Sequence, residues 1–176
     1  MTIKHACLVE RSDPGGRWLW LFPAAFAVHI VEESFAGEGF HRWIRRMTGR
    51  EVGAGTLLVL NAGFEVAMIA AVRRARRGRA EWVAPALGVI GVAEGLYHPA
   101  GSALTRSYSP GTASGVGLWA PLGVAALVHS RRSLPRRARR RGIAAGLLIT
   151  ASLVPLALAV SHPSSADGAA ARADHS

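Results

Sequence analysis

Five long apolar segments, separated by clusters of arginine, dominate this sequence. They cover residues 18–37, 53–72, 82–104, 112–129 and 142–161. Each segment is about as long as the roughly 20 residues that cross a bilayer as a helix. Only helices and closed barrels satisfy their backbone hydrogen bonds in lipid, and apolar runs without alternation favour helices. The sequence therefore predicts an all-α, polytopic membrane bundle of about five transmembrane helices within residues 17–161.

Polar segments flank this predicted bundle, and one amphipathic segment interrupts it. Residues 1–16 are predicted to form an N-terminal tail, and residues 162–176, rich in Ser, Ala and Asp, a disordered C-terminal tail. Arginines alternate with apolar residues after the first segment. The apolar residues at helical spacing are Phe40, Trp43, Ile44 and Met47. We interpret this stretch as an interfacial helix that lies on the membrane surface.

The positive charge of the chain is concentrated beside the apolar segments. The formal net charge is +10, and arginines cluster at residues 73–79 and 131–141. Arginines in such positions contact anionic lipid headgroups and mark cytoplasmic loops. We therefore predict a multi-pass protein of the cell's inner (plasma) membrane, with a cytoplasmic N-terminus and an external C-terminus. The lipid bilayer is the predicted partner, and no nucleic-acid motif accompanies the charge.

Ionisable and polar residues occur inside three consecutive apolar segments. Charged residues at the bilayer centre cost about 2.5–3.5 kcal/mol each on insertion scales, so they usually mark a site or a polar network. The residues are His29, Glu32 and Glu33 in the first segment, Asn61 and Glu65 in the second, and Glu94 and His98 in the third. A rise of about 1.5 Å per residue places His29, Asn61 and Glu94 at one level in antiparallel helices. We expect these helices to gather the polar groups into one pocket.

Imidazole and carboxylate groups in a helical bundle are suitable ligands for Zn, Fe or Mn. The first hypothesis is a small membrane enzyme that binds one or two divalent metal ions and acts on a lipid-like substrate. Its metal ligands are His29, Glu33 and His98, its acid–base groups are Glu32 and Glu94, and Asn61 and Glu65 orient the ligands. The order H-x-x-E-E does not match the zinc-protease order H-E-x-x-H.

Two non-enzymatic hypotheses remain open for the same residues. In one, the cluster relays protons in a transporter or a small-solute binder. In the other, the histidines and glutamates neutralise one another in the core of a structural membrane protein.

Residues 106–111 also allow two interpretations, because Pro110-Gly111 indicates a turn. This loop is either a tight turn anchored by Tyr108 or a lid over an outward-facing pocket, with Arg106 or Tyr108 contacting an anionic group.

The motif His29-Ile-Val-Glu-Glu33 resembles the HXXEE-domain family of bacterial membrane proteins, which is named after it. The likeness continues through Glu94-Gly-Leu-Tyr-His98 and Arg106-Ser-Tyr-Ser-Pro-Gly111. Relatives often carry Asn where this chain has Glu94. The resemblance covers roughly residues 18–160 and implies a multi-pass membrane domain with a His/Glu site, without an activity that can be transferred.

Overall fold

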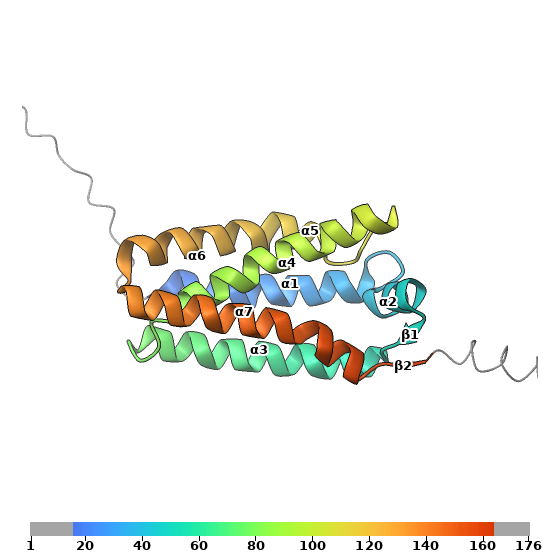
Figure 1. Ribbon diagram of the computed structural model, residues 1–176, viewed down its shortest axis with the longest axis horizontal. Coiled ribbons are helices and arrows are strands. Elements are labelled where there is room, and N and C mark those ends of the chain that lie inside the picture. The colour runs from blue at the N-terminus through green and yellow to red at the C-terminus, as the bar shows by residue number, and fades with distance from the viewer. Residues whose placement is uncertain (1–15, 164–176) are drawn as a thin grey trace, which may run out of the picture.

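Each of the five apolar segments forms a long helix, so the all-α prediction is confirmed. The computed structural model describes residues 16–163. The long helices are α1 (Leu21–Phe35), α3 (Ala54–Arg76), α4 (Val83–Thr105), α6 (Ala120–Ser133) and α7 (Arg136–Ala159). The short elements are η1 (Arg17–Trp20), α2 (Phe40–Thr48), β1 (Arg50–Glu51), α5 (Thr112–Ser114), the π-helical turn η2 (Gly115–Trp119) and β2 (His162–Pro163). Figure 1 shows the long helices running lengthwise in one bundle.

Three helices are long and apolar enough to cross a membrane on their own within the described residues. They are Ala54–Arg76, the continuous run Thr112–Ser133, and Arg136–Ala157. A fourth span is obtained if η1 and α1 are counted together with α2, across a bend of 61°. The predicted number of five is therefore not confirmed. Helix α4 is not among these spans, because Glu94, His98 and several Gly and Pro residues lower its hydropathy.

Helix α4 is the central helix of the bundle and packs against both α6 and α7. Glycines permit its close contact with α6. A Cβ atom added to Gly123 would lie 2.6 Å from the backbone nitrogen of Val92, and one added to Gly91 would lie 2.8 Å from the carbonyl oxygen of Trp119. Small residues at such crossings let two backbones approach in membrane bundles. The close α4–α6 contact fixes the position of the loop that joins them.

The apolar core lies between α1, the η2 turn and the halves of α3 and α4 that adjoin the turn between them. Phe22, Val72 and Trp119 are fully buried there. The Trp119 ring contacts Phe22 and Phe26 in edge-on geometry, with centroid distances of 5.9 and 5.8 Å. Offset and edge-on aromatic pairs are favourable beyond the area that they bury. This aromatic contact holds α1 beside the start of the Thr112–Ser133 run.

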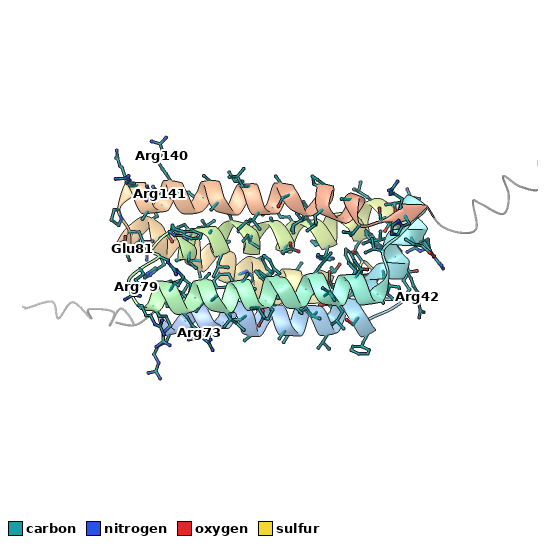
Figure 2. All side chains as sticks on the ribbon, turned by 90° about the horizontal axis from the view of Figure 1, so that it is seen from below. Arg42, Arg73, Arg79, Glu81, Arg140 and Arg141 are labelled. Atoms are coloured by element: carbon teal, nitrogen blue, oxygen red, sulfur yellow. The ribbon has the colours of Figure 1, made fainter. Side chains whose placement is uncertain are left out.

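The arginine-rich turns lie together at one end of the bundle. Figure 2 shows Arg73, Arg79, Arg140 and Arg141 at this end and Arg42 at the other. The arrangement agrees with the prediction that both turns face the same side of a membrane. Which side that is remains a prediction.

The opposite end of the bundle carries α2 and the short β1–β2 pair (Figure 1). The predicted amphipathic segment is indeed helical, although its position on a membrane surface stays a prediction. His162 and Pro163 pair antiparallel with β1, so regular structure extends two residues past the predicted limit at 161. Of the predicted tails, 1–16 and 162–176, residues 1–15 and 164–176 lie outside the described residues.

Arg46 connects α2 to its neighbours. Its guanidinium donates hydrogen bonds to the Glu38 carboxylate and to the Ser107 hydroxyl, the latter at 2.9 Å. The hydrogen bond from Arg46 holds the pKa of Glu38 below its ordinary value. This exposed contact ties α2 to the loop that follows α4.

Candidate functional site

His29 and Glu33 of α1 face His98 of α4 and form one compact cluster. One ligand atom from each of the three residues lies within 4.8 Å of the others. The Glu33 Oε1 atom is 3.6 Å from both the His29 Nε2 and the His98 Nε2 atom. The two imidazole rings are 4.9 Å apart between centroids and are almost completely buried. The structure therefore brings together the three residues that the sequence suggests as metal ligands.

Glu94 contributes a second carboxylate to the same cluster. Its Oε2 atom lies 3.9 Å from His29 Nε2 and 3.6 Å from His98 Nε2. Two ligand atoms on a tetrahedral zinc ion are about 3.4 Å apart, given metal–ligand bonds of about 2.0–2.1 Å. The four imidazole-to-carboxylate spacings are a few tenths of an ångström wider, and the ligand atoms of His29, Glu33 and His98 lie within 4.8 Å of one another. The four side chains would have to move inward to coordinate one ion.

Each of the three candidate ligands is held in orientation by a neighbouring polar side chain. The Ser114 hydroxyl shares a hydrogen bond of 2.7 Å with His29 Nδ1, and the Ser109 hydroxyl one of 3.3 Å with His98 Nδ1. The Asn61 amide donates to Glu33 Oε2 at 3.2 Å. These contacts leave both Nε2 atoms and Glu33 Oε1 directed at a common centre. Hydrogen bonds to the far side of each ligand are typical of metal sites in proteins.

Glu32 lies outside this cluster and holds the loop that follows α4. Its Oε1 atom accepts hydrogen bonds from the backbone N–H of Gly111 and Ala113 and from the Tyr108 hydroxyl, while Oε2 accepts one from the N–H of Ser114. A carboxylate at the first N–H groups of a helix satisfies donors that have no partner within the helix. The geometry gives Glu32 a positioning role, because the loop that it holds carries Ser109 and Ser114.

Gly111 lies directly against the two imidazoles. A Cβ atom added at this position would be 2.7 Å from the Cε1 atoms of both His29 and His98. Its φ of 100° also belongs to the left-handed region that favours glycine. The loop can therefore close over the histidines only because this residue has no side chain.

Three other residues suggested by the sequence are not brought to the cluster. Glu65 does not line the adjoining cavity, and its Oε2 atom has no hydrogen-bond partner among the described residues. Arg106 is exposed at the end of α4. Tyr108 lies over Glu32 rather than over the histidines, and its ring is about half exposed. The loop thus contacts the site through its serines and glycine.

Sequence reasoning missed the serines and the aromatic wall of the site. The sequence predicts a turn or a lid at residues 106–111 and no role for Ser109 or Ser114, although small hydroxyl residues beside a histidine motif are candidates for orienting groups. Phe26, Phe40 and Trp119 have rings within 6.3 Å of an imidazole, measured between centroids. Their positions depend on the packing of separate helices, which the sequence does not display.

A cavity of about 360 Å³ adjoins the cluster. Its polar lining comes from the cluster together with Asn61 and Ser109, and the rest is mainly apolar. The apolar lining includes Phe40 and Trp43 of α2, Leu57 and Leu60 of α3, and Leu153 and Leu156 of α7. The volume lies at the lower end of the range of small-molecule sites, about 300–1,000 Å³. The site therefore combines a buried His/Glu cluster with an apolar chamber.

A family model described as "Protein of unknown function with HXXEE motif" matches residues 20–126, which is more than half of the chain. The matched region includes all the residues of the His/Glu cluster and the loop that closes over it. No match was found among curated proteins or among solved structures.

Proposed function

The chain belongs to the HXXEE family, whose function is unknown, and we propose that it is a membrane metalloprotein that binds one divalent metal ion through His29, Glu33 and His98. We propose further that it is an enzyme and that its lipid-like substrate reaches the ion from the apolar cavity. Zn²⁺, Fe²⁺ and Mn²⁺ are the ions that suit two imidazoles and a carboxylate.

One observation carries this proposal: three ligand atoms converge while the opposite side of each ligand is hydrogen-bonded. The converging atoms are His29 Nε2, His98 Nε2 and Glu33 Oε1. A core that only neutralises buried charge needs paired groups, but it does not need two imidazoles fixed with their free nitrogens towards one centre. Convergent ligands with outer hydrogen bonds favour a metal site.

Such an ion would have coordination positions left for water or substrate, as catalytic sites with three protein ligands do. A metal held by these residues would supply Lewis-acid chemistry, polarising a carbonyl oxygen and lowering the pKa of a bound water. The Glu94 carboxylate is within 4 Å of both Nε2 atoms, so it can accept the proton of that water or complete the coordination. The reaction class supported best is metal-assisted attack of water on a carbonyl or a similar electrophilic group.

We also propose the orientation of the protein in the plasma membrane. The two arginine-rich turns at residues 73–79 and 131–141 would face the cytoplasm, and the end with α2 and the β1–β2 pair would face outward. The His/Glu cluster then lies nearer the outer surface.

Metal analysis of the purified full-length protein tests the proposal. The protein is extracted in detergent without chelators, and its Zn, Fe and Mn contents are measured by mass spectrometry together with the protein concentration. We expect one equivalent of metal in the wild type and a loss of that metal in Glu33→Gln and His98→Ala. Glu65→Gln is the matched control, because it neutralises another carboxylate inside the bundle away from the cluster, and it should retain the metal.

Two outcomes contradict the metal site. The first is a wild-type protein that contains no metal and gains none on addition of Zn²⁺, Fe²⁺ or Mn²⁺. The second is equal metal content in the wild type, Glu33→Gln and His98→Ala. A cluster that only stabilises the fold would lower the melting temperature in these variants without any bound metal.

A further inference from the structure

The cavity beside the His/Glu cluster has the size of a single hydrocarbon chain. A methylene group occupies about the volume of a liquid water molecule, roughly 30 Å³, so the cavity holds roughly a dozen such groups. Its volume is about 360 Å³, and its walls away from the cluster are mainly apolar side chains. Two chains of a membrane lipid would not fit together. The chamber suits one acyl chain whose polar end lies at the cluster.

One wall of this chamber is formed by α3 and α7 together. Helix α3 packs mainly on α1, η1 and α4, and α7 packs mainly on α4, whereas close backbone approaches between α3 and α7 are few among the described residues. Both helices are candidate membrane spans. Leu57 and Leu60 of α3 and Leu153 and Leu156 of α7 nevertheless line the same cavity. A seam between two loosely associated spans faces the acyl chains of the surrounding lipid.

The cluster lies about two helical turns from the end of the bundle that carries α2. His29 lies six residues before the end of α1, and His98 seven residues before the end of α4. At 1.5 Å per residue, both are about 10 Å from that end of the bundle. The polar headgroup regions and the hydrocarbon core meet near the ends of such helices. The cluster therefore lies about 10 Å on the hydrocarbon side of this junction, and the bond next to a head group reaches it when the head group is drawn that far toward the polar cluster.

The charge at this end of the bundle favours an anionic head group. Arg42, Arg45, Arg46 and Arg50 lie in or next to α2, where the nearby acidic residues Glu38 and Glu51 pair with two of them. The net charge of this group is therefore positive. Basic residues near a membrane surface attract anionic lipids.

From these observations we propose that one acyl chain of an anionic membrane lipid enters the cavity laterally, between α3 and α7. The bond that joins this chain to the polar part of the lipid then lies at His29, Glu33 and His98. The assignment of the lipid's reacting bond rests on the proposed metal site, whereas the binding of the chain does not.

Photolabelling of the full-length protein in lipid nanodiscs tests this inference. The probe is phosphatidylglycerol with a diazirine in one acyl chain, and the labelled residues are identified by peptide mass spectrometry. We expect label on α3 around Leu57 and Leu60 and on α7 around Leu153 and Leu156. Leu60→Trp fills the cavity and should abolish the label on α7. Val59→Trp is the matched control, because Val59 is 71% exposed on the same helix, and it should leave the α7 label unchanged.

Ala157→Trp, on the opposite wall of the cavity, provides a second test if Leu60→Trp does not fold. Equal labelling of the wild type and of the folded cavity-filling variant overturns the proposal that a chain enters. Equal labelling by the phosphatidylcholine analogue of the probe overturns the preference for an anionic head group.

The metal content of the same samples is also measured. A wild type that is labelled at the cavity but free of metal overturns only the proposed metal site, whereas a metal-containing protein without cavity label overturns only the lipid proposal.

Discussion

Replacing Glu32 by Gln tests whether this residue positions the loop over the histidines. The substitution keeps the size of the side chain but removes its charge and one accepting oxygen. Of the four hydrogen bonds that Glu32 accepts, the one from the Ser114 N–H to Oε2 is then lost, because the new amide group is a donor. The bonds from Gly111, Ala113 and Tyr108 remain, but to a neutral oxygen.

The expected cost follows from the burial of these partners. A hydrogen bond to a charged group contributes about 1.5–3 kcal/mol and a neutral one about 0.5–1.5 kcal/mol. The lost bond to Ser114 and the weaker bond to Gly111 together predict a loss of about 2–4 kcal/mol in the free energy of unfolding. Ala113 and Tyr108 are exposed to solvent, so their weaker bonds add little. Because Ser114 orients His29, metal affinity should also fall about 10- to 100-fold, as is usual when outer hydrogen-bonding groups of metal sites are changed.

Both quantities can be measured on the same purified protein. Thermal or denaturant unfolding in detergent gives the stability, and competition with a fluorescent chelator gives the affinity for Zn²⁺. Glu38→Gln is the control, since it removes a carboxylate from an exposed pair outside the bundle and should change both values little. The reasoning is refuted if Glu32→Gln behaves like Glu38→Gln in both assays.

Three further predictions concern packing and pH. Gly111→Ala should reduce metal binding strongly, because its methyl group would meet both imidazoles; metal titration of the folded variant checks this, and an affinity equal to the wild type would contradict it. Gly123→Val should lower the free energy of unfolding by about 1–3 kcal/mol or more, since its side chain would overlap backbone atoms of α4; an unchanged melting temperature would exclude the close α4–α6 contact. The Arg46–Glu38 pair lowers the pKa of Glu38, so its stabilisation of α2 should be complete above the ordinary pKa of 4.5 and decline as the pH falls through the lowered value. Hydrogen exchange of α2, corrected for the intrinsic pH dependence, should show this decline in the wild type but not in Glu38→Gln.

The sequence was sufficient for the helices and for part of the site because both depend on local patterns. Long apolar runs form helices in lipid because the backbone must make all its hydrogen bonds internally there. The i, i+4 spacing puts His29 with Glu33 on one helix face and Glu94 with His98 on another. The rise per residue then placed α1, α3 and α4 at compatible depths. That estimate is why His29, Asn61, Glu94 and their neighbours could be expected to meet.

The parts that the sequence did not reveal depend on the packing between helices and on the path of a loop. Glu32 and Glu33 are adjacent in the motif, and nothing local indicates that one holds a loop while the other faces the histidines. The roles of Ser109 and Ser114 require the loop after α4 to fold back over α1, and that path is set by the close contact of Gly91 and Gly123. The count of five spans is not confirmed at α4 for a related reason, because its polar residues face other helices and lower its hydropathy.

Adjacent residues of an α-helix project about 100° apart, so the two neighbouring glutamates of α1 reach different structures from one turn. A small rotation or axial shift of α1 consequently disturbs the cluster at Glu33 and the loop at Glu32 at the same time. Any ion that draws Glu33 inward therefore also changes the strength with which the loop is held. Coupling between two binding sites is reciprocal. If the bound ion weakens the binding of a molecule that displaces the loop, that molecule weakens the binding of the ion by the same factor.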